Sequence, residues 1–187
     1  MRLRWPPPPL GLGTPFNFAA LSAETRPLLT RSWWLIPSAG LLTACALFAV
    51  DYAFFGGATF RATPSLASHP PVASRVLVSL VGSFGEELVF RGLLASTAGW
   101  LVFLALRGGR HPERIAQAVA VVAAAVAVGL MHVGQTGKPS ELWRIMTINA
   151  VGHGVYGTFF FARGFEVAML THAVVTALLY IGWPALR

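Results

Sequence analysis

Long apolar runs are the feature that most limits how this chain can fold. They recur between residues 33 and 183 in stretches of about 18 residues or more, and a helix needs roughly 20 residues to cross the hydrocarbon of a bilayer. Only 11% of the residues are charged, whereas a soluble domain usually carries about 25% because its surface must be hydrated. Backbone amides in lipid must be paired within the chain, so the runs should be helices. The sequence therefore predicts an all-α fold, a polytopic integral membrane bundle of about five to six transmembrane helices.

The loops between the runs divide the chain into three parts. Residues 1–32 contain a run of prolines and several arginines, which predicts an extended cytoplasmic leader. Residues 33–71 predict a first transmembrane helix, over 33–55, followed by a loop rich in glycine and proline. Residues 72–187 predict the helical core.

Four apolar segments make up this core, at 72–106, 114–132, 141–162 and 165–183. The first is longer than one ordinary crossing requires. It predicts either one tilted helix or a shorter helix with a break near Gly82, Gly85 or Gly99.

The net charge of +7 indicates a lipid partner and not a nucleic acid. The arginines lie between the apolar runs and do not form one basic stripe, so anionic lipid headgroups are the expected partner. The sequence predicts a protein that contacts the lipid bilayer and binds no nucleic acid. Its pattern does not indicate an oligomeric state.

Three charged residues stand inside an apolar segment, in Glu86-Glu87-Leu88-Val89-Phe90-Arg91. Each costs roughly 2.5–3.5 kcal/mol at the centre of a spanning helix, so all three should point into the bundle. Glu87 and Arg91 are four residues apart with the acid first, the favourable order for an ion pair on one helix face. Glu86 is turned about 100° from that face and should find another partner. A purely structural ion-pair cluster is the alternative interpretation.

Histidines lie in three of the other predicted helices, at His132, His153 and His172. A single histidine in a packed helix is usually a core residue, but three on separate helices of so apolar a chain indicate a shared site. Imidazole can take a proton, donate a hydrogen bond or bind a metal near neutral pH. Together with a carboxylate, such histidines could activate water and stabilise the oxyanion of a tetrahedral intermediate.

The order of these residues resembles the CAAX-protease and bacteriocin-processing family of glutamate-dependent intramembrane proteases. The family's first motif, two glutamates followed after three residues by arginine, is intact as Glu86-Glu87-Leu88-Val89-Phe90-Arg91. In the second motif, an aromatic residue four places before a histidine, Val128 stands before His132. In the third, a histidine four places before Asn or Asp, His172 is followed by Thr176. The resemblance extends over about residues 75–182.

The resemblance implies an intramembrane endopeptidase that cuts near the C-terminus or a membrane-proximal segment of a membrane-associated protein or peptide. Glu86 and His132 would hold and deprotonate the attacking water, and His172 would stabilise the oxyanion. The supporting residues would be Glu87, Arg91 and Thr176, with His153 or Asn149 able to replace the oxyanion role of Thr176. The predicted location is a prokaryotic inner membrane.

Other interpretations remain open at this stage. No cofactor is expected, but a zinc protease with Glu86, His132 and His172 as ligands is an alternative, although the His-Glu-x-x-His signature is absent. A non-catalytic scaffold, immunity or transport protein could use the same polar cluster. Prenylated peptides, bacteriocin leaders and membrane sorting tails are all candidate substrates by resemblance, and no residue selects among them.

Overall fold

The computed structural model describes residues 33–57, 71–106, 108–136 and 142–185 of the chain. All regular elements within these ranges are helical, which confirms the predicted all-α class. The predicted leader, residues 1–32, lies outside the described residues, as does most of the loop before residue 71. The elements are α2 (Leu35–Phe55), α5 (Val72–Glu87), η1 (Leu88–Ala95), α6 (Ser96–Leu106), α7 (Pro112–Thr136), α8 (Leu142–Arg163) and α9 (Phe165–Ala185).

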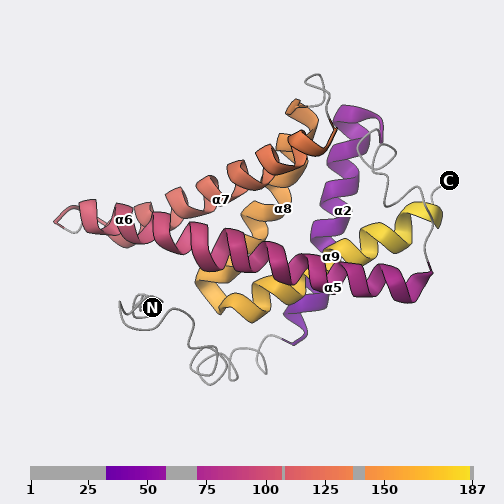
Figure 1. Ribbon diagram of the computed structural model, residues 1–187, viewed down its shortest axis with the longest axis horizontal. Helices are drawn as coiled ribbons and strands as arrows, with labels where there is room; N and C mark the ends of the chain where they lie inside the picture. The colour runs from indigo at the N-terminus through magenta and orange to yellow at the C-terminus, as the bar shows by residue number, and fades with distance from the viewer. Residues whose placement is uncertain (1–32, 58–70, 107, 137–141, 186–187) are drawn as a thin grey trace.

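Elements α5, η1 and α6 run on from one another as a single 35-residue helix, Val72–Leu106 (Figure 1). Of the two predicted alternatives, the uninterrupted helix is the one observed. Its backbone changes at η1, which has the wider π-helical turn, and not at the three glycines where a break was considered. At about 1.5 Å per residue the helix is roughly 50 Å long, which exceeds the roughly 30 Å of hydrocarbon in a bilayer. It must therefore tilt or extend beyond the hydrocarbon.

Three helices in the described ranges are long and apolar enough to cross a membrane: Leu35–Phe55, Val72–Leu106 and Pro112–His132. This is fewer than the five to six spanning helices that the sequence predicted. Helix α8 carries Arg144, Asn149 and His153 among its apolar residues, and α9 contains the shorter apolar helix Phe165–Tyr180. Helices α8 and α9, like the long helix, contribute polar side chains to the interior, among them His153 and His172.

Small residues allow the helices to approach closely, as is usual where packing in lipid has little hydrophobic driving force. A Cβ atom added to Gly129 of α7 would lie 2.5 Å from Met146 Sδ of α8. One added to Gly157 of α8 would lie 3.0 Å from a methyl group of Val121. Between α6 and α7, a Cβ on Gly99 would lie 3.3 Å from that of Ala120. Helix α7 is thus held between α6 and α8 by contacts that larger side chains would prevent.

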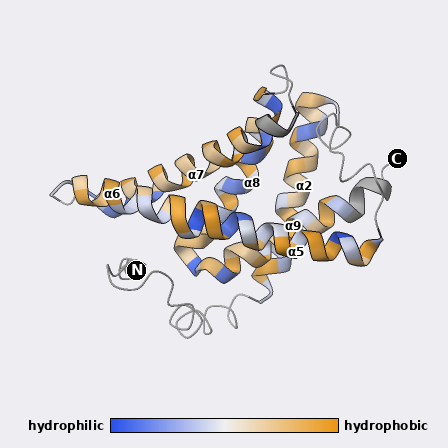
Figure 2. Cartoon of the chain, viewed as in Figure 1, coloured by the Kyte–Doolittle hydropathy of each residue, from blue (hydrophilic) through white to orange (hydrophobic). Residues whose placement is uncertain are grey.

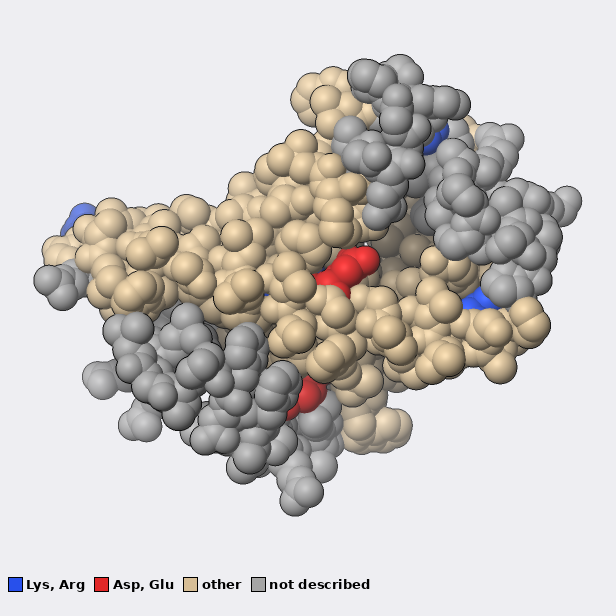
Figure 3. Space-filling view, in the orientation of Figure 1, with Lys and Arg blue, Asp and Glu red and all other residues tan. Residues whose placement is uncertain are grey.

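Large apolar side chains cover much of the outer surface, and few charges interrupt them (Figure 3). Trp33 and Trp34 are exposed beside the start of α2, and Trp143 is exposed at the start of α8. Tryptophan collects at membrane–water interfaces because its ring is amphipathic. The apolar exterior and the long apolar helices together describe an integral membrane protein.

Candidate active site

A hydrophilic stretch lies near the middle of the long helix, between apolar segments (Figure 2). Glu87 and Arg91 have no exposed side-chain surface, and Glu87 Oε1 lies 3.1 Å from Arg91 Nη1. The predicted i, i+4 ion pair is therefore confirmed. A buried charge needs such a partner, because an unpaired ion in a low-dielectric interior is strongly destabilising.

Arg91 lies within η1, where the helix widens. The Ser96 hydroxyl donates a 2.8 Å hydrogen bond to the Arg91 carbonyl oxygen, and the Ser96 backbone N–H bonds to the same oxygen. Both bonds span five residues, as the π-helical turn requires. Short π-helical segments inside α-helices are frequent at functional sites, and here the segment begins directly after the two glutamates.

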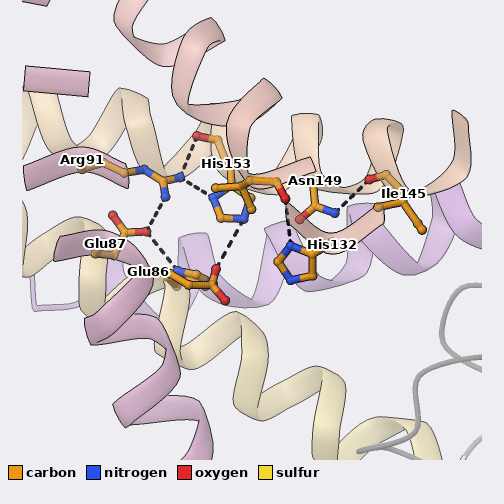
Figure 4. A network of polar contacts seen from close by, with 9 residues as sticks. Glu86, Glu87, Arg91, His132, Ile145, Asn149 and His153 are labelled. Atoms are coloured by element: carbon orange, nitrogen blue, oxygen red, sulfur yellow. Dashed lines mark hydrogen bonds and ion pairs between the residues drawn. The ribbon is translucent and has the colours of Figure 1, made fainter. Parts of the chain in front are cut away.

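The buried ion pair binds one histidine from each of two other helices (Figure 4). Arg91 Nη2 lies 2.6 Å from Nδ1 of His153, on α8, and also donates to the His153 carbonyl oxygen at 3.2 Å. Glu87 Oε1 lies 2.9 Å from Nδ1 of His172, on α9. Both imidazole rings are buried. Three helices thus meet at one ion pair.

Glu86 occupies the accessible edge of this cluster. Its side chain is 27% exposed, and its Oε2 lies 3.8 Å from His153 Nε2 and 3.9 Å from His172 Nε2. The expectation that Glu86 would find partners other than Arg91 is borne out by these two approaches. Figure 3 shows an acidic patch over the middle of the long helix, beside a hollow in the surface. Glu86 is therefore the carboxylate of the cluster that solvent or a substrate can reach.

Tyr156 is a site residue that the sequence reasoning did not single out. Its buried ring stacks on His172 with centroids 4.3 Å apart and an interplanar angle of 16°. It also meets His153 edge-on at 5.4 Å, and the Arg91 guanidinium lies 5.8 Å from its ring centre. Tyr156 follows His153 by three residues on α8, and this same-face spacing was the available signal.

Three other residues named from the sequence lie outside these direct contacts. His132, on α7, bonds through Nδ1 to the Val128 carbonyl oxygen of its own helix at 2.9 Å. Asn149 donates to the Ile145 carbonyl oxygen at 2.9 Å (Figure 4). Thr176 is half-buried on α9, four residues after His172. Their predicted roles remain predictions.

One group of three side chains in the described residues has the spacing of metal ligands. Its donor atoms, on Glu86, His153 and His172, all lie within 4.8 Å of one another. The zinc alternative drawn from sequence named His132 in place of His153, and it shares Glu86 and His172 with this group.

The family comparison matches residues 68–178 to the family described as type II CAAX prenyl endopeptidase Rce1-like. This range includes every residue of the cluster, from Glu86 to His172. No curated protein matches the chain, and no solved structure matches it. The family match covers more than half of the 187 residues. The chain is therefore a member of the type II CAAX prenyl endopeptidase Rce1-like family.

Proposed function

We propose that this protein is an intramembrane endopeptidase that cuts a membrane-associated protein or peptide near its C-terminus or a membrane-proximal segment. The observation that carries the proposal is the convergence of Glu86 Oε2 with the Nε2 atoms of two buried histidines. Membership in the Rce1-like family supports a CAAX-type peptide substrate. A prokaryotic inner membrane is the predicted compartment.

Glu86 is proposed as the general base. Its carboxylate lies at the accessible edge of the cluster, where a water molecule can come within hydrogen-bond reach of it. The three converging atoms are close enough for one oxygen atom to hydrogen-bond to all of them at about 2.7–3.2 Å. That position suits a water molecule before attack and the tetrahedral oxygen after it.

The other residues have proposed roles around this position. Glu87 and Arg91 hold the two histidines, and Tyr156 keeps their rings in place by stacking. His132 is proposed to assist Glu86 with the water from the α7 side, through the Nε2 atom that its own helix leaves available. His172 and Thr176 are proposed to stabilise the oxyanion, with His153 or Asn149 in support.

The reaction is proposed to proceed without a metal. Arginine is only a donor, so Arg91 occupies the lone pair of His153 Nδ1. A metal on His153 Nε2 would then require the ring to lose both protons. This hydrogen bond makes the cluster better suited to holding water and an oxyanion than to holding zinc.

The first test compares purified wild type with Glu86→Gln on a panel of membrane-anchored peptides, with and without a chelator. Gln keeps the shape of the side chain and removes the base. Wild type should cut equally well with the chelator. Glu86→Gln should lose at least a factor of about 10² in kcat, the lower end of what general-base removal costs.

Three other outcomes would point elsewhere. Equal cleavage by Glu86→Gln would remove Glu86 from the mechanism. Specific capture of a peptide that the folded wild type never cuts would favour a non-catalytic binding protein. Loss of cleavage with chelator, restored by added zinc, would favour the metal mechanism.

A further inference from the structure

The single ion pair between Glu87 and Arg91 bonds to the two histidines with opposite polarity. Arg91 reaches His153 Nδ1 at 2.6 Å, and Glu87 reaches His172 Nδ1 at 2.9 Å. A guanidinium can only donate hydrogen bonds, whereas an ionised carboxylate can only accept them. Nδ1 must therefore be a hydrogen-bond acceptor in one ring and a donor in the other.

The hydrogen bond from Arg91 determines the tautomer of His153. Because Arg91 donates to Nδ1, that nitrogen must carry a lone pair, so the single proton of the neutral ring lies on Nε2. The second bond from Arg91 Nη2, to the His153 carbonyl oxygen at 3.2 Å, holds the guanidinium against this residue. His153 Nε2 thus presents an N–H toward Glu86 Oε2, 3.8 Å away.

On His172, Nδ1 is instead the hydrogen-bond donor. Glu87 accepts from Nδ1, so that nitrogen keeps its proton in the neutral and the charged ring alike. The proton of His172 that can come and go is the one on Nε2, which lies 3.9 Å from Glu86 Oε2. One nitrogen facing Glu86 is thus a fixed donor, and the other can exchange a proton.

We infer that Arg91 is a positioning residue that holds His153 as the oxyanion donor of this enzyme. This inference rests on the proposed endopeptidase function and assigns to His153 the donor role that the resembled family places at position 176. Thr176 has a short hydroxyl side chain and lies among half-buried residues of α9. The His153 N–H is buried, faces Glu86 and costs no reorganisation when charge develops.

The step balances without any further reactant. Glu86 takes one proton of the water, and the oxygen forms a bond to the carbonyl carbon. The carbonyl electron pair moves onto its oxygen, and the resulting oxyanion accepts the hydrogen bond from His153 Nε2. When the intermediate collapses, the C–N bond breaks and the proton held by Glu86 passes to the leaving amine.

A matched pair of variants separates a catalytic N–H from a structural contact. The Gln side chain can place an amide N–H where Nε2 lies, whereas the shorter Asn side chain reaches only as far as Nδ1. His153→Gln should keep kcat within about tenfold of wild type. His153→Asn should lose about 10²–10³ in kcat, as other enzymes do when one oxyanion donor is removed, with KM little changed because the oxyanion exists only beyond the ground state.

The opposite order would overturn the inference. If His153 acts only through its contact with Arg91, then Asn will preserve activity and Gln will lose it. Both variants are compared with Glu86→Gln. If that variant cuts like wild type, the role of Glu86 as general base fails separately from this inference, and if wild type cuts no peptide, the endopeptidase proposal itself fails.

A measurement that needs no substrate tests the same inference in the folded protein. Ring ¹⁵N NMR of histidine-labelled wild type should show His153 with an unprotonated Nδ1 and a protonated Nε2. Arg91→Lys keeps a cation for Glu87 but replaces the planar fork by a point charge, so His153 should lose this single pattern and kcat should fall. A protonated Nδ1 in wild type, or an unchanged pattern in Arg91→Lys, would show that Arg91 does not set the tautomer.

Discussion

At the residue scale, the site depends on two buried charges that have few other partners. Glu87 Oε1 serves both Arg91 and His172, while Glu87 Oε2 has no hydrogen-bond partner in the described part of the chain. Each charge is therefore stabilised mainly by the other. Removing one charged side chain leaves the other as an unpaired ion away from water, whereas removing both leaves a gap without a buried charge. The loss in free energy of unfolding should therefore differ between the two changes.

Replacing the two charges one at a time and together tests this dependence. Arg91→Met and Glu87→Leu should each destabilise the protein by about 3–5 kcal/mol, the range observed when one partner of a buried pair is removed. The double variant should lose much less than the sum. Thermal unfolding in one detergent gives the three differences. A double variant that loses the full sum would show that the two charges are stabilised independently.

At the element scale, two glycines on α8 differ in how closely the neighbouring helix approaches them. A Cβ on Gly157 would come within 3.0 Å of Val121 on α7, whereas a Cβ on Gly154 would meet nothing within 4 Å. Both lie inside the same helix, so their backbone preferences are alike. Of these two glycines, only Gly157 lies at a close contact between α7 and α8.

An alanine pair on α8 measures this difference. Gly154→Ala should stabilise the protein by up to about 1 kcal/mol, because alanine favours a helix over glycine. Gly157→Ala should destabilise it by about 1–3 kcal/mol, the usual cost of overpacking. Unfolding of both variants in the same detergent is the measurement. Equal stability would mean that Val121 shifts without cost and that the contact is loose.

At the scale of the whole molecule, the surface is that of a protein solvated by lipid. Three long apolar helices and an exterior rich in exposed Leu, Val and Trp side chains would leave a large apolar area in water. Soluble proteins rarely expose such areas. The polar cluster is the exception to this apolar composition, and its buried side chains are solvated by one another and by neither water nor lipid.

Extraction of membranes is the corresponding test. The protein should stay in the membrane pellet after alkaline carbonate and leave it only with detergent. The reason is that its apolar helices are solvated by lipid, and water cannot replace that contact. Immunodetection in the two fractions is sufficient. Release by carbonate alone would contradict an integral arrangement.

Much of this protein follows from the sequence by itself. Apolar runs of spanning length and scarce charges determine the helices, since backbone groups in lipid must pair within their own segment. The spacing of Glu87 and Arg91 determines their ion pair, because residues four apart share a helix face. The motif around Glu86, with the order and spacing of His132 and His172 after it, indicated the family to which the chain belongs.

Only the tertiary structure decided which histidines serve this ion pair. The resemblance assigns roles to His132 and His172, but the spacing of the three histidines, each within a predicted helix, does not mark any of them as a partner of this ion pair. Their roles diverge because the packing of α8 and α9 against the long helix brings His153 and His172 to Arg91 and Glu87, whereas Nδ1 of His132 bonds within α7. Tyr156 enters the site by the same packing. Contacts between helices depend on how their faces are rotated and spaced, and no short-range pattern in the chain determines that rotation.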